Sequence, residues 1–359
     1  MGAFQIISGN ALAELFTARV YPKLVQEILH VNGKGVDESY VEQRLGAASI
    51  SIPRIALGAG SFRTLGASVN GGQFNANDPV VSTSDFIEIP LLYVYDRTEE
   101  MSRIVNDKAG YEYLQGKIDN ITKKIARGIN ALTFSVQISR ALNDAVTDGS
   151  VITYYDPATN KPLDIVIDVN GKLDEGDEAI GVDYFPSENR QGLCRPSFIN
   201  AMKKRDGGLI LNSELGQQML ATGYLNPWTN SEASKVELRN GYSGEVDGVP
   251  MYKVSSVLWK LAEQFTVANG NALTSGAFDN IEGMICSSWG TLRGFSAAEN
   301  IEVIPSQKGQ GWTIQPLVHG GCVCISGKSV GLIVNDDFTN PASSTVTLST
   351  LPPESQPNA

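Results

Sequence analysis

Residues 111–144 read YEYLQGKIDNITKKIARGINALTFSVQISRALND, and this stretch decides the fold. Its large apolar residues recur at steps of three and four, which is typical of one face of an amphipathic helix. The pattern extends over residues 106–148, with Asn106 or Asp107 able to cap its start and Gly149 directly after its end. About 40 residues at about 1.5 Å each make a rod of roughly 60 Å. The apolar stripe consists of Leu114, Ile118, Ile121, Ile125, Ile129, Leu132 and Val136.

The same stretch is locally basic, although the whole chain is acidic with a net charge of −11. Between positions 117 and 140 the only acidic residue is Asp119. Two interpretations remain open: a patch that faces a polyanion such as DNA or an acidic scaffold segment, or a solvated helix face. The candidate site residues are Lys117, Lys123, Lys124 and Arg127.

Upstream of the helix, the sequence predicts an arm and a hairpin. Residues 1–45 contain an amphipathic stretch that Pro22 divides into two pieces. Residues 50–96 hold two β-type runs, and between them residues 69–78 are rich in Gly and Asn, which is typical of a loop tip. This hairpin has too few large apolar residues for a core of its own. We expect it to project and to lie on a neighbouring molecule.

Residues 151–193 are predicted to form an acidic β insertion. Apolar residues alternate through residues 163–169, and Asn170-Gly171 follows them, which is a strong signal for a hairpin turn. A weak resemblance to a calcium loop fails because Leu173 stands where the turn glycine belongs.

The rest of the chain mixes strands with helix. Strands are predicted within residues 251–257, 283–287 and 312–334, and Ser213 is expected to cap a helix. Residues 339–359 are rich in Ser, Thr and Pro, so we expect them to be ordered only where neighbouring molecules hold them.

The composition excludes several classes of function. The chain has 359 residues, with 39 acidic against 28 basic side chains, so the whole molecule does not bind nucleic acid through non-specific charge. It lacks an apolar run of about 18 residues, the length needed to span a membrane, and no secretory signal is expected at its N-terminus. Four cysteines in a chain of this length do not make a disulfide framework, and only two histidines are present.

Two motifs that could carry chemistry are rejected. Cys322 and Cys324, with His319 nearby, lack the second separated ligand pair of a structural zinc site, so they are interpreted as small core residues of a strand. Residues 327–329 read Gly-Lys-Ser like the end of a phosphate-binding loop, but Cys322 occupies the position of its first glycine. We therefore predict no catalytic residue, no metal site and no cofactor.

The order of the elements resembles the tailed-phage major capsid proteins of the Hong Kong 97-type fold. Residues 111–144 resemble the spine helix, residues 247–252 (DGVPMY) resemble a strand of the axial domain, and residues 314–334 resemble the closing strands of the peripheral domain. The resemblance implies an α+β fold with an N-terminal arm, an extended β-hairpin loop, a long spine helix in a peripheral domain, and an α/β axial domain.

This resemblance divides the chain into seven parts. They are the N-terminal arm (1–45), the extended hairpin loop (46–97), the peripheral domain with the spine helix (98–150), the acidic β insertion (151–193), the axial domain (194–300), the returning peripheral strands (301–338) and the C-terminal tail (339–359).

The resemblance also implies a function. The chain is expected to be a structural protein and not an enzyme, assembling in the host cytoplasm into hexamers and pentamers of the icosahedral virion shell. Its expected partners are other copies of itself, portal and scaffolding proteins, a decoration protein and, non-specifically, packaged double-stranded DNA; no membrane partner is expected. The alternatives are the shell of an encapsulin-type nanocompartment and a soluble metal- or nucleotide-dependent enzyme.

We predict that the assembled shells are held together non-covalently. Some members of this fold join subunits through an isopeptide bond from a hairpin lysine, which requires a deprotonated amine as nucleophile. This sequence has no lysine between Lys34 and Lys108, and the guanidinium groups of Arg54 and Arg63 stay protonated. Particles boiled in detergent should run as a single band near 38.5 kDa. A ladder of larger species that resists reducing agent would contradict this prediction.

Overall fold

The computed structural model describes residues 28–38, 49–55, 84–90, 93–96, 99–147, 152–177, 180, 182–205, 242–268, 271, 273, 275–295, 300–305, 311–342 and 347–349. In several strands and in the first part of the long helix it describes the backbone but not the side chains. The expected hairpin tip at 69–78, the helix expected after Ser213 and the first 27 residues of the expected arm lie outside the described residues.

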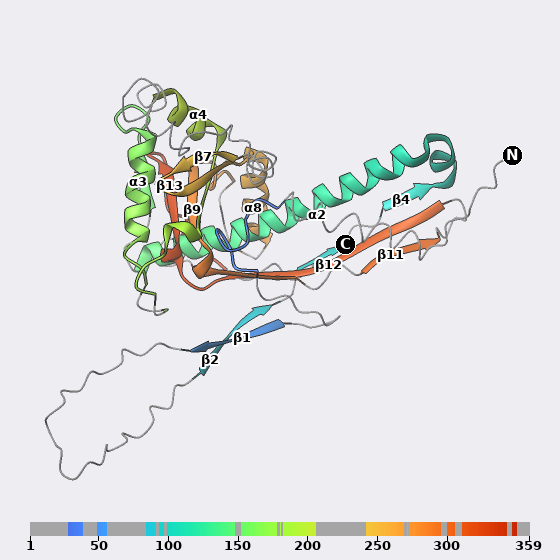
Figure 1. Cartoon of the computed structure of the whole chain (residues 1–359), viewed down its shortest axis with the longest axis horizontal. Coiled ribbons are helices and arrows are strands. Elements are labelled where there is room, and N and C mark those ends of the chain that lie inside the picture. Colours follow the sequence, from blue (N-terminus) through green and yellow to red (C-terminus); the bar gives the residue numbers. More distant parts are fainter. Residues whose placement is uncertain are drawn as a thin grey trace, which may run out of the picture.

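A two-stranded ribbon is formed by β1 (Ser49–Ile55) and β2 (Ser84–Pro90), which confirms the two expected strands upstream of the helix. Its antiparallel register places Ile50 opposite Ile89 and Ile52 opposite Ile87. The ribbon extends away from the rest of the molecule (Figure 1). Ile89 is fully buried, because β2 lies against the body of the protein at this end.

A five-stranded sheet is built around the long strand β12 (Gly311–Cys324). Along one edge of β12 lie β3 (Tyr93–Asp96) and β4 (Glu99–Ser102). Along the other edge lie β10 (Thr291–Phe295) and β11 (Asn300–Pro305). Segments that are more than 200 residues apart in the sequence are therefore neighbours in this sheet.

The helix α2 (Arg103–Thr147) follows β4 directly and has 45 residues. This confirms the expected long helix, which begins three residues earlier than Asn106. At about 1.5 Å per residue it is about 67 Å long, and its first half runs beside β12 (Figure 1). Ile125, Ile129, Leu132 and Val136 of the expected apolar stripe are at most 1% exposed.

A six-stranded sheet forms the second part of the fold. The helices α3 (Pro162–Leu173) and α4 (Pro196–Arg205) cover one face, and α8 (Ser256–Ala268) and the second half of α2 cover the other. In order across the sheet the strands are β5 (Ile152–Tyr155), β13 (Val330–Asn335), β9 (Ile281–Ser287), β6 (Arg190–Cys194), β8 (Val249–Lys253) and β7 (Tyr242–Val246).

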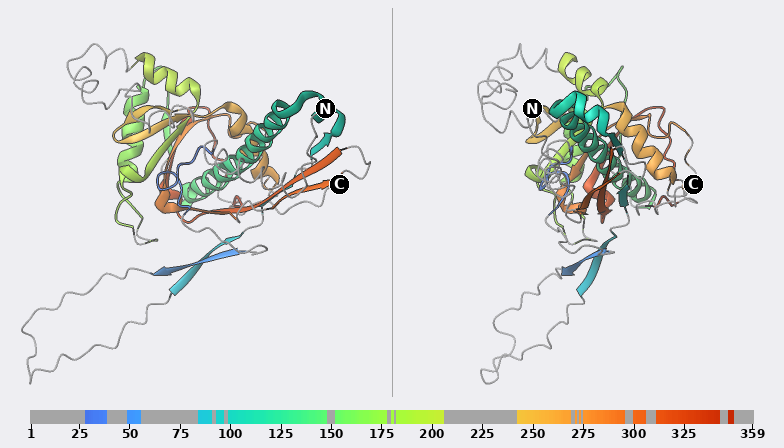
Figure 2. Two further views of the ribbon diagram at one scale, coloured as in Figure 1. Left: turned by 45° about the vertical axis from the view of Figure 1, so that its right-hand side comes forward. Right: turned by 90° about the vertical axis from the view of Figure 1, so that its right-hand side faces the viewer.

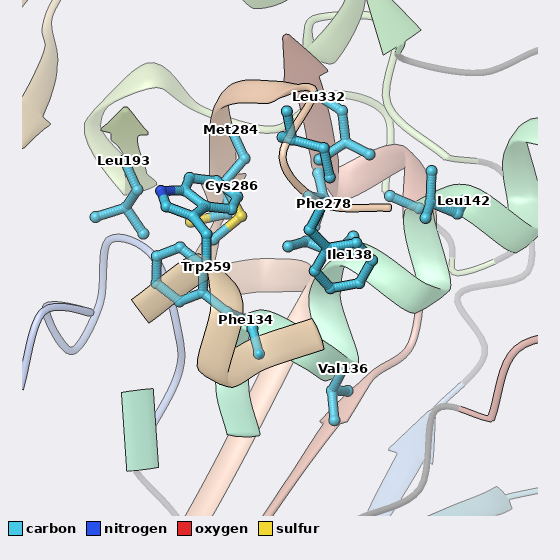
Figure 3. Close-up of a cluster of buried hydrophobic side chains, with 14 of the residues drawn as sticks. Phe134, Val136, Ile138, Leu142, Leu193, Trp259, Phe278, Met284, Cys286 and Leu332 are labelled. Carbon is cyan, nitrogen blue, oxygen red and sulfur yellow. The ribbon is translucent and has the colours of Figure 1, made fainter. Parts of the chain in front are cut away.

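The inner strands of this sheet, β13, β9, β6 and β8, are buried on both faces. In β6, Leu193 packs with α2 and α8, whereas the next residue, Cys194, packs with α3 and α4. On the α2 side, Trp259 of α8 meets Phe134 of α2 edge to face, with ring centroids 5.0 Å apart (Figure 3). A strand with two buried faces gives a continuous apolar run and not an alternating one. β9 and β13 overlap the strands predicted at 283–287 and within 312–334.

The expected strand and hairpin at residues 163–171 are wrong, because this stretch is the helix α3. Its buried residues Ile165, Val166, Val169 and Leu173 lie at helical spacing, and Pro162 stands at its first turn, where proline favours a helix start. The apparent alternation arose because Ile167 is apolar but about half exposed. β5 pairs in parallel with β13, so residues 152–155 belong to the main sheet and not to a separate β insertion.

The described part of the C-terminal tail is held by its own chain. Leu348 is 2% exposed, and its backbone exchanges two hydrogen bonds with the side chain of Asn143 on α2, at 2.7 and 2.8 Å. The backbone N–H of Ser349 also donates to Oδ1 of Asn271, at 3.0 Å. The expectation that only neighbouring molecules order the tail is therefore wrong for residues 347–349.

Replacement of Gly171 distinguishes the helix from the hairpin. Gly171→Ala should raise the free energy of unfolding by about 0.5–1 kcal/mol, because Gly171 lies in the last turn of α3, an added Cβ meets nothing within 4 Å, and alanine favours a helix. Urea unfolding measures this. Gly248→Ala is the control: Gly248 has φ +75° in the β7–β8 turn, so alanine should destabilise by about 1 kcal/mol. Destabilisation by Gly171→Ala would contradict the helix.

Candidate functional site

The predicted basic patch lies on the outward side of α2. Lys123 and Arg127 are exposed and one helical turn apart, and Lys124 is half-buried. The residues between them, Ile125 and Ala126, are buried against the body of the protein. The side chain of Lys117 lies outside the described residues. The helix thus presents at least two adjacent cations to the outside, which a polyanion partner requires.

Sequence reasoning missed a second site, in which polar side chains hold an N-terminal segment. Residues 28–38, here called the clasp, lie against α2, β6 and β10. Ile28 and Val36 are buried apolar residues of the clasp, and His30 is buried with them. The clasp falls within the predicted arm, yet it is anchored on its own chain.

Amide side chains bind the backbone at the start of the clasp. Gln191 of β6 donates from Nε2 to the carbonyl of Leu29 at 2.7 Å, and its Oε1 accepts from the N–H of Val31 at 2.9 Å. Asn130 of α2 accepts from the N–H of Leu29 at 3.0 Å. Farther along the clasp, position 35 must be a glycine, because a Cβ there would lie 2.7 Å from Oε1 of Gln191.

Arg293 of β10 holds the end of the clasp. Its side chain is 1% exposed and forms an ion pair with Glu38. It also donates to Oγ1 of Thr133 on α2 at 3.2 Å and to the carbonyl of His30 at 3.3 Å. A buried guanidinium is stable only when its charge and its N–H groups are satisfied, so the clasp supplies the carboxylate that Arg293 needs.

His30 and Gln137 connect the clasp to the helix. Nε2 of His30 lies 2.9 Å from Oε1 of Gln137, and the His30 ring packs edge to face on Phe134, with centroids 5.2 Å apart. Nε2 of Gln137 donates to the carbonyl of Gly35 at 3.1 Å and to Oγ1 of Thr291 at 3.2 Å. Burial, assisted by the positive charge of Arg293, lowers the pKa of His30 to about 3. His30 is therefore neutral at pH 7.

The sequence contains one weak signal for this site. Gln137 interrupts the apolar stripe of the predicted helix, and Gln191 stands in a strand whose residues are all buried. A buried amide needs hydrogen-bond partners, so each residue indicates a polar contact inside the protein. The partners lie 107 and about 160 residues away along the chain, which no local spacing reveals.

The residues of the two rejected motifs have structural roles. Burial raises the pKa of Cys322 to about 12 and that of Cys324 to about 11, so both thiols are protonated at neutral pH. Within the described residues there is no group of three or more His, Cys, Asp or Glu side chains that could hold a metal ion. The N–H of Gly327 donates to Asp144 at 2.7 Å, and the turn at 327–329 leads into a strand and not into a helix.

No helix in the described part of the chain is long and apolar enough to cross a membrane.

Comparison of the chain with protein-family models finds no match, and comparison with curated proteins finds none. Among solved structures, a chain in the capsid of Ralstonia phage GP4 matches with a TM-score of 0.55 at 9% sequence identity, covering 86% of this chain and 94% of that chain. The mature capsid of bacteriophage PhiM1 gives a TM-score of 0.47 at 12% identity, with 86% and 88% covered. A virus-like particle from Pyrococcus furiosus gives 0.44 at 9% identity, with 89% and 98% covered.

The match to the Ralstonia phage GP4 capsid shows the fold of this chain. It confirms the predicted α+β phage-capsid fold.

The hydrogen bonds of Gln191 predict a measurable loss of stability. Gln191→Leu should lower the free energy of unfolding by about 2–3 kcal/mol, because the Leu29 carbonyl and the Val31 N–H would both lose their partner on burial. Gln264→Leu is the matched control, since Gln264 is exposed on α8 and its replacement should change stability by at most about 0.5 kcal/mol. Equal unfolding midpoints for the two variants would contradict the role of Gln191.

Proposed function

We propose that this chain is a major capsid protein that assembles into hexamers and pentamers of an icosahedral shell around the double-stranded DNA of a tailed phage. The fold shared with the capsid chain of Ralstonia phage GP4 carries the proposal. The continuous architecture of ribbon, long helix and two sheets supports it, because these parts have the order expected from the sequence.

The parts of the chain have separate roles in this proposal. The ribbon β1–β2 is the base of the extended loop, and α2 with the β12 sheet is the peripheral domain. The six-stranded sheet with α3, α4 and α8 is the axial domain. The ribbon supports this assignment: it contains two strands and projects from the body, and a two-stranded ribbon alone is at best marginally stable in water. It therefore gains stability by lying on a neighbouring subunit.

The charge distribution fits a wall that encloses DNA. A net charge of −11 keeps most of the surface from binding DNA tightly. The basic patch at Lys123, Lys124 and Arg127 offers a local exception, where packaged DNA or an acidic segment of a scaffolding protein binds. Portal and decoration proteins are further partners in this proposal, and the shell is assembled in the host cytoplasm.

Imaging tests the proposal. Purified protein examined by negative-stain electron microscopy should show closed particles of uniform diameter when it is produced with its assembly partners. Particles produced with the remaining phage proteins should contain DNA. Closed particles that enclose an enzyme in place of DNA would favour the nanocompartment alternative. A chain that stays monomeric and acts on a small molecule would contradict a shell function.

The basic patch gives a second test. The double change Lys123→Gln and Arg127→Gln should lower the yield of DNA-containing particles several-fold, with an unchanged unfolding midpoint, because both side chains are exposed. The matched control is Lys161→Gln with Lys260→Gln, which removes the same charge from the exposed residue that precedes α3 and from an exposed position on α8. Equal particle yield and DNA content in the two double variants would leave the patch as a solvated helix face.

A further inference from the structure

We propose that the clasp, residues 28–38, is a releasable part of the subunit, and that protonation of His30 opens it while the six-stranded sheet stays folded. The clasp adds only a few apolar side chains to the core, with Leu29 and Val31 partly buried, and is otherwise attached through hydrogen bonds and one ion pair, whereas the sheet is held by two large apolar clusters. Parts of a protein with few buried apolar contacts open with a lower free energy than the core. This inference does not depend on the proposed function.

The hydrogen bonds around Gln137 determine where a proton can bind on His30. Nε2 of Gln137 donates to the carbonyl of Gly35, which can only accept, so this contact fixes the orientation of the amide. Oε1 of Gln137 therefore faces Nε2 of His30, and Nε2 must carry the hydrogen. In the neutral ring, Nδ1 is left as the unprotonated nitrogen, and an added proton must bind there.

The closed clasp offers no place for that proton. Nδ1 of His30 is buried without a hydrogen-bond partner. A protonated Nδ1 would be a buried donor with no acceptor, close to the positive charge of Arg293. When the clasp opens, water accepts the hydrogen bond and the two positive charges separate. Protonation therefore favours the open state.

The other groups around His30 do not supply a countercharge. Glu38 already forms the ion pair with Arg293. Burial raises the pKa of Cys286 to about 12, so its thiol is neutral. The side chains that face this part of the clasp are Phe134 and Gln137 of α2, Gln191 of β6, Cys286 of β9, and Thr291 and Arg293 of β10.

The size of the effect follows from the pKa of His30. Its pKa is about 3 in the closed clasp, against the ordinary 6.5 when the ring is in water. The closed-state pKa is depressed, so opening takes up a proton below pH 6.5, and the stability of the closed clasp falls as the pH falls. The opening equilibrium constant should rise about 25-fold between pH 7 and pH 5 through this one group.

Hydrogen exchange on the unaltered full-length chain tests the release. The N–H groups of Leu29, Val31 and Asp37 are bonded across the clasp and report its opening. Their protection, corrected for the intrinsic pH dependence of exchange, should be lower than that of the β9 N–H groups and should fall about 25-fold from pH 7 to pH 5. If the clasp and β9 share one protection factor at both pH values, the clasp opens only with global unfolding and the proposal is wrong.

Two substitutions assign the pH dependence to its source. In His30→Gln, the clasp should keep the same protection at pH 7 and pH 5, because the titrating group is gone. Glu38→Gln is the matched control: it weakens the ion pair with Arg293 and should lower protection at both pH values, while the 25-fold dependence remains. A full pH dependence in His30→Gln would overturn the role of His30.

Discussion

The continuity of α2 is the constraint on which the rest of the structure depends. Its first half lies along β12, and its second half passes beneath the six-stranded sheet, so one helix fixes the two sheets relative to each other (Figures 1 and 2). Residues 131–139 are all buried, which means that this segment of α2 is enclosed on every side. A break in this stretch would remove a packing partner that both sheets share.

An enclosed helix needs polar contacts as well as apolar ones. Ser135 of α2 pairs with Thr266 of α8 at 2.6 Å, and Thr133 receives a hydrogen bond from Arg293. Phe134, between these two residues, packs on Trp259 (Figure 3) and also on His30. The clasp, the helix and the sheet core are therefore connected through consecutive residues of α2.

Elements with a strong local pattern could be predicted from the sequence. The long helix follows from its apolar periodicity, and the two ribbon strands follow from β-type runs; strands within 283–287 and 312–334 were also predicted. The prediction of a strand and hairpin at 163–171 was wrong because the exposed Ile167 completed a false alternation, whereas burial follows the helical spacing. The basic patch could be predicted from the sequence because its residues are close together along the chain. The clasp could not be predicted, because its contacts join residues that are 101 to 263 positions apart. Such pairing depends on the completed fold.

A cryo-electron microscopy map of particles assembled from the purified chain and its partners tests the shell assignment most directly. The map should show a closed shell of repeated subunits, each with α2 and β12 continuous and with the β1–β2 ribbon resting on an adjacent subunit. Each clasp should lie on its own subunit at neutral pH. A failure to form closed particles under every assembly condition, or a map in which the ribbon contacts no neighbour, would contradict this assignment.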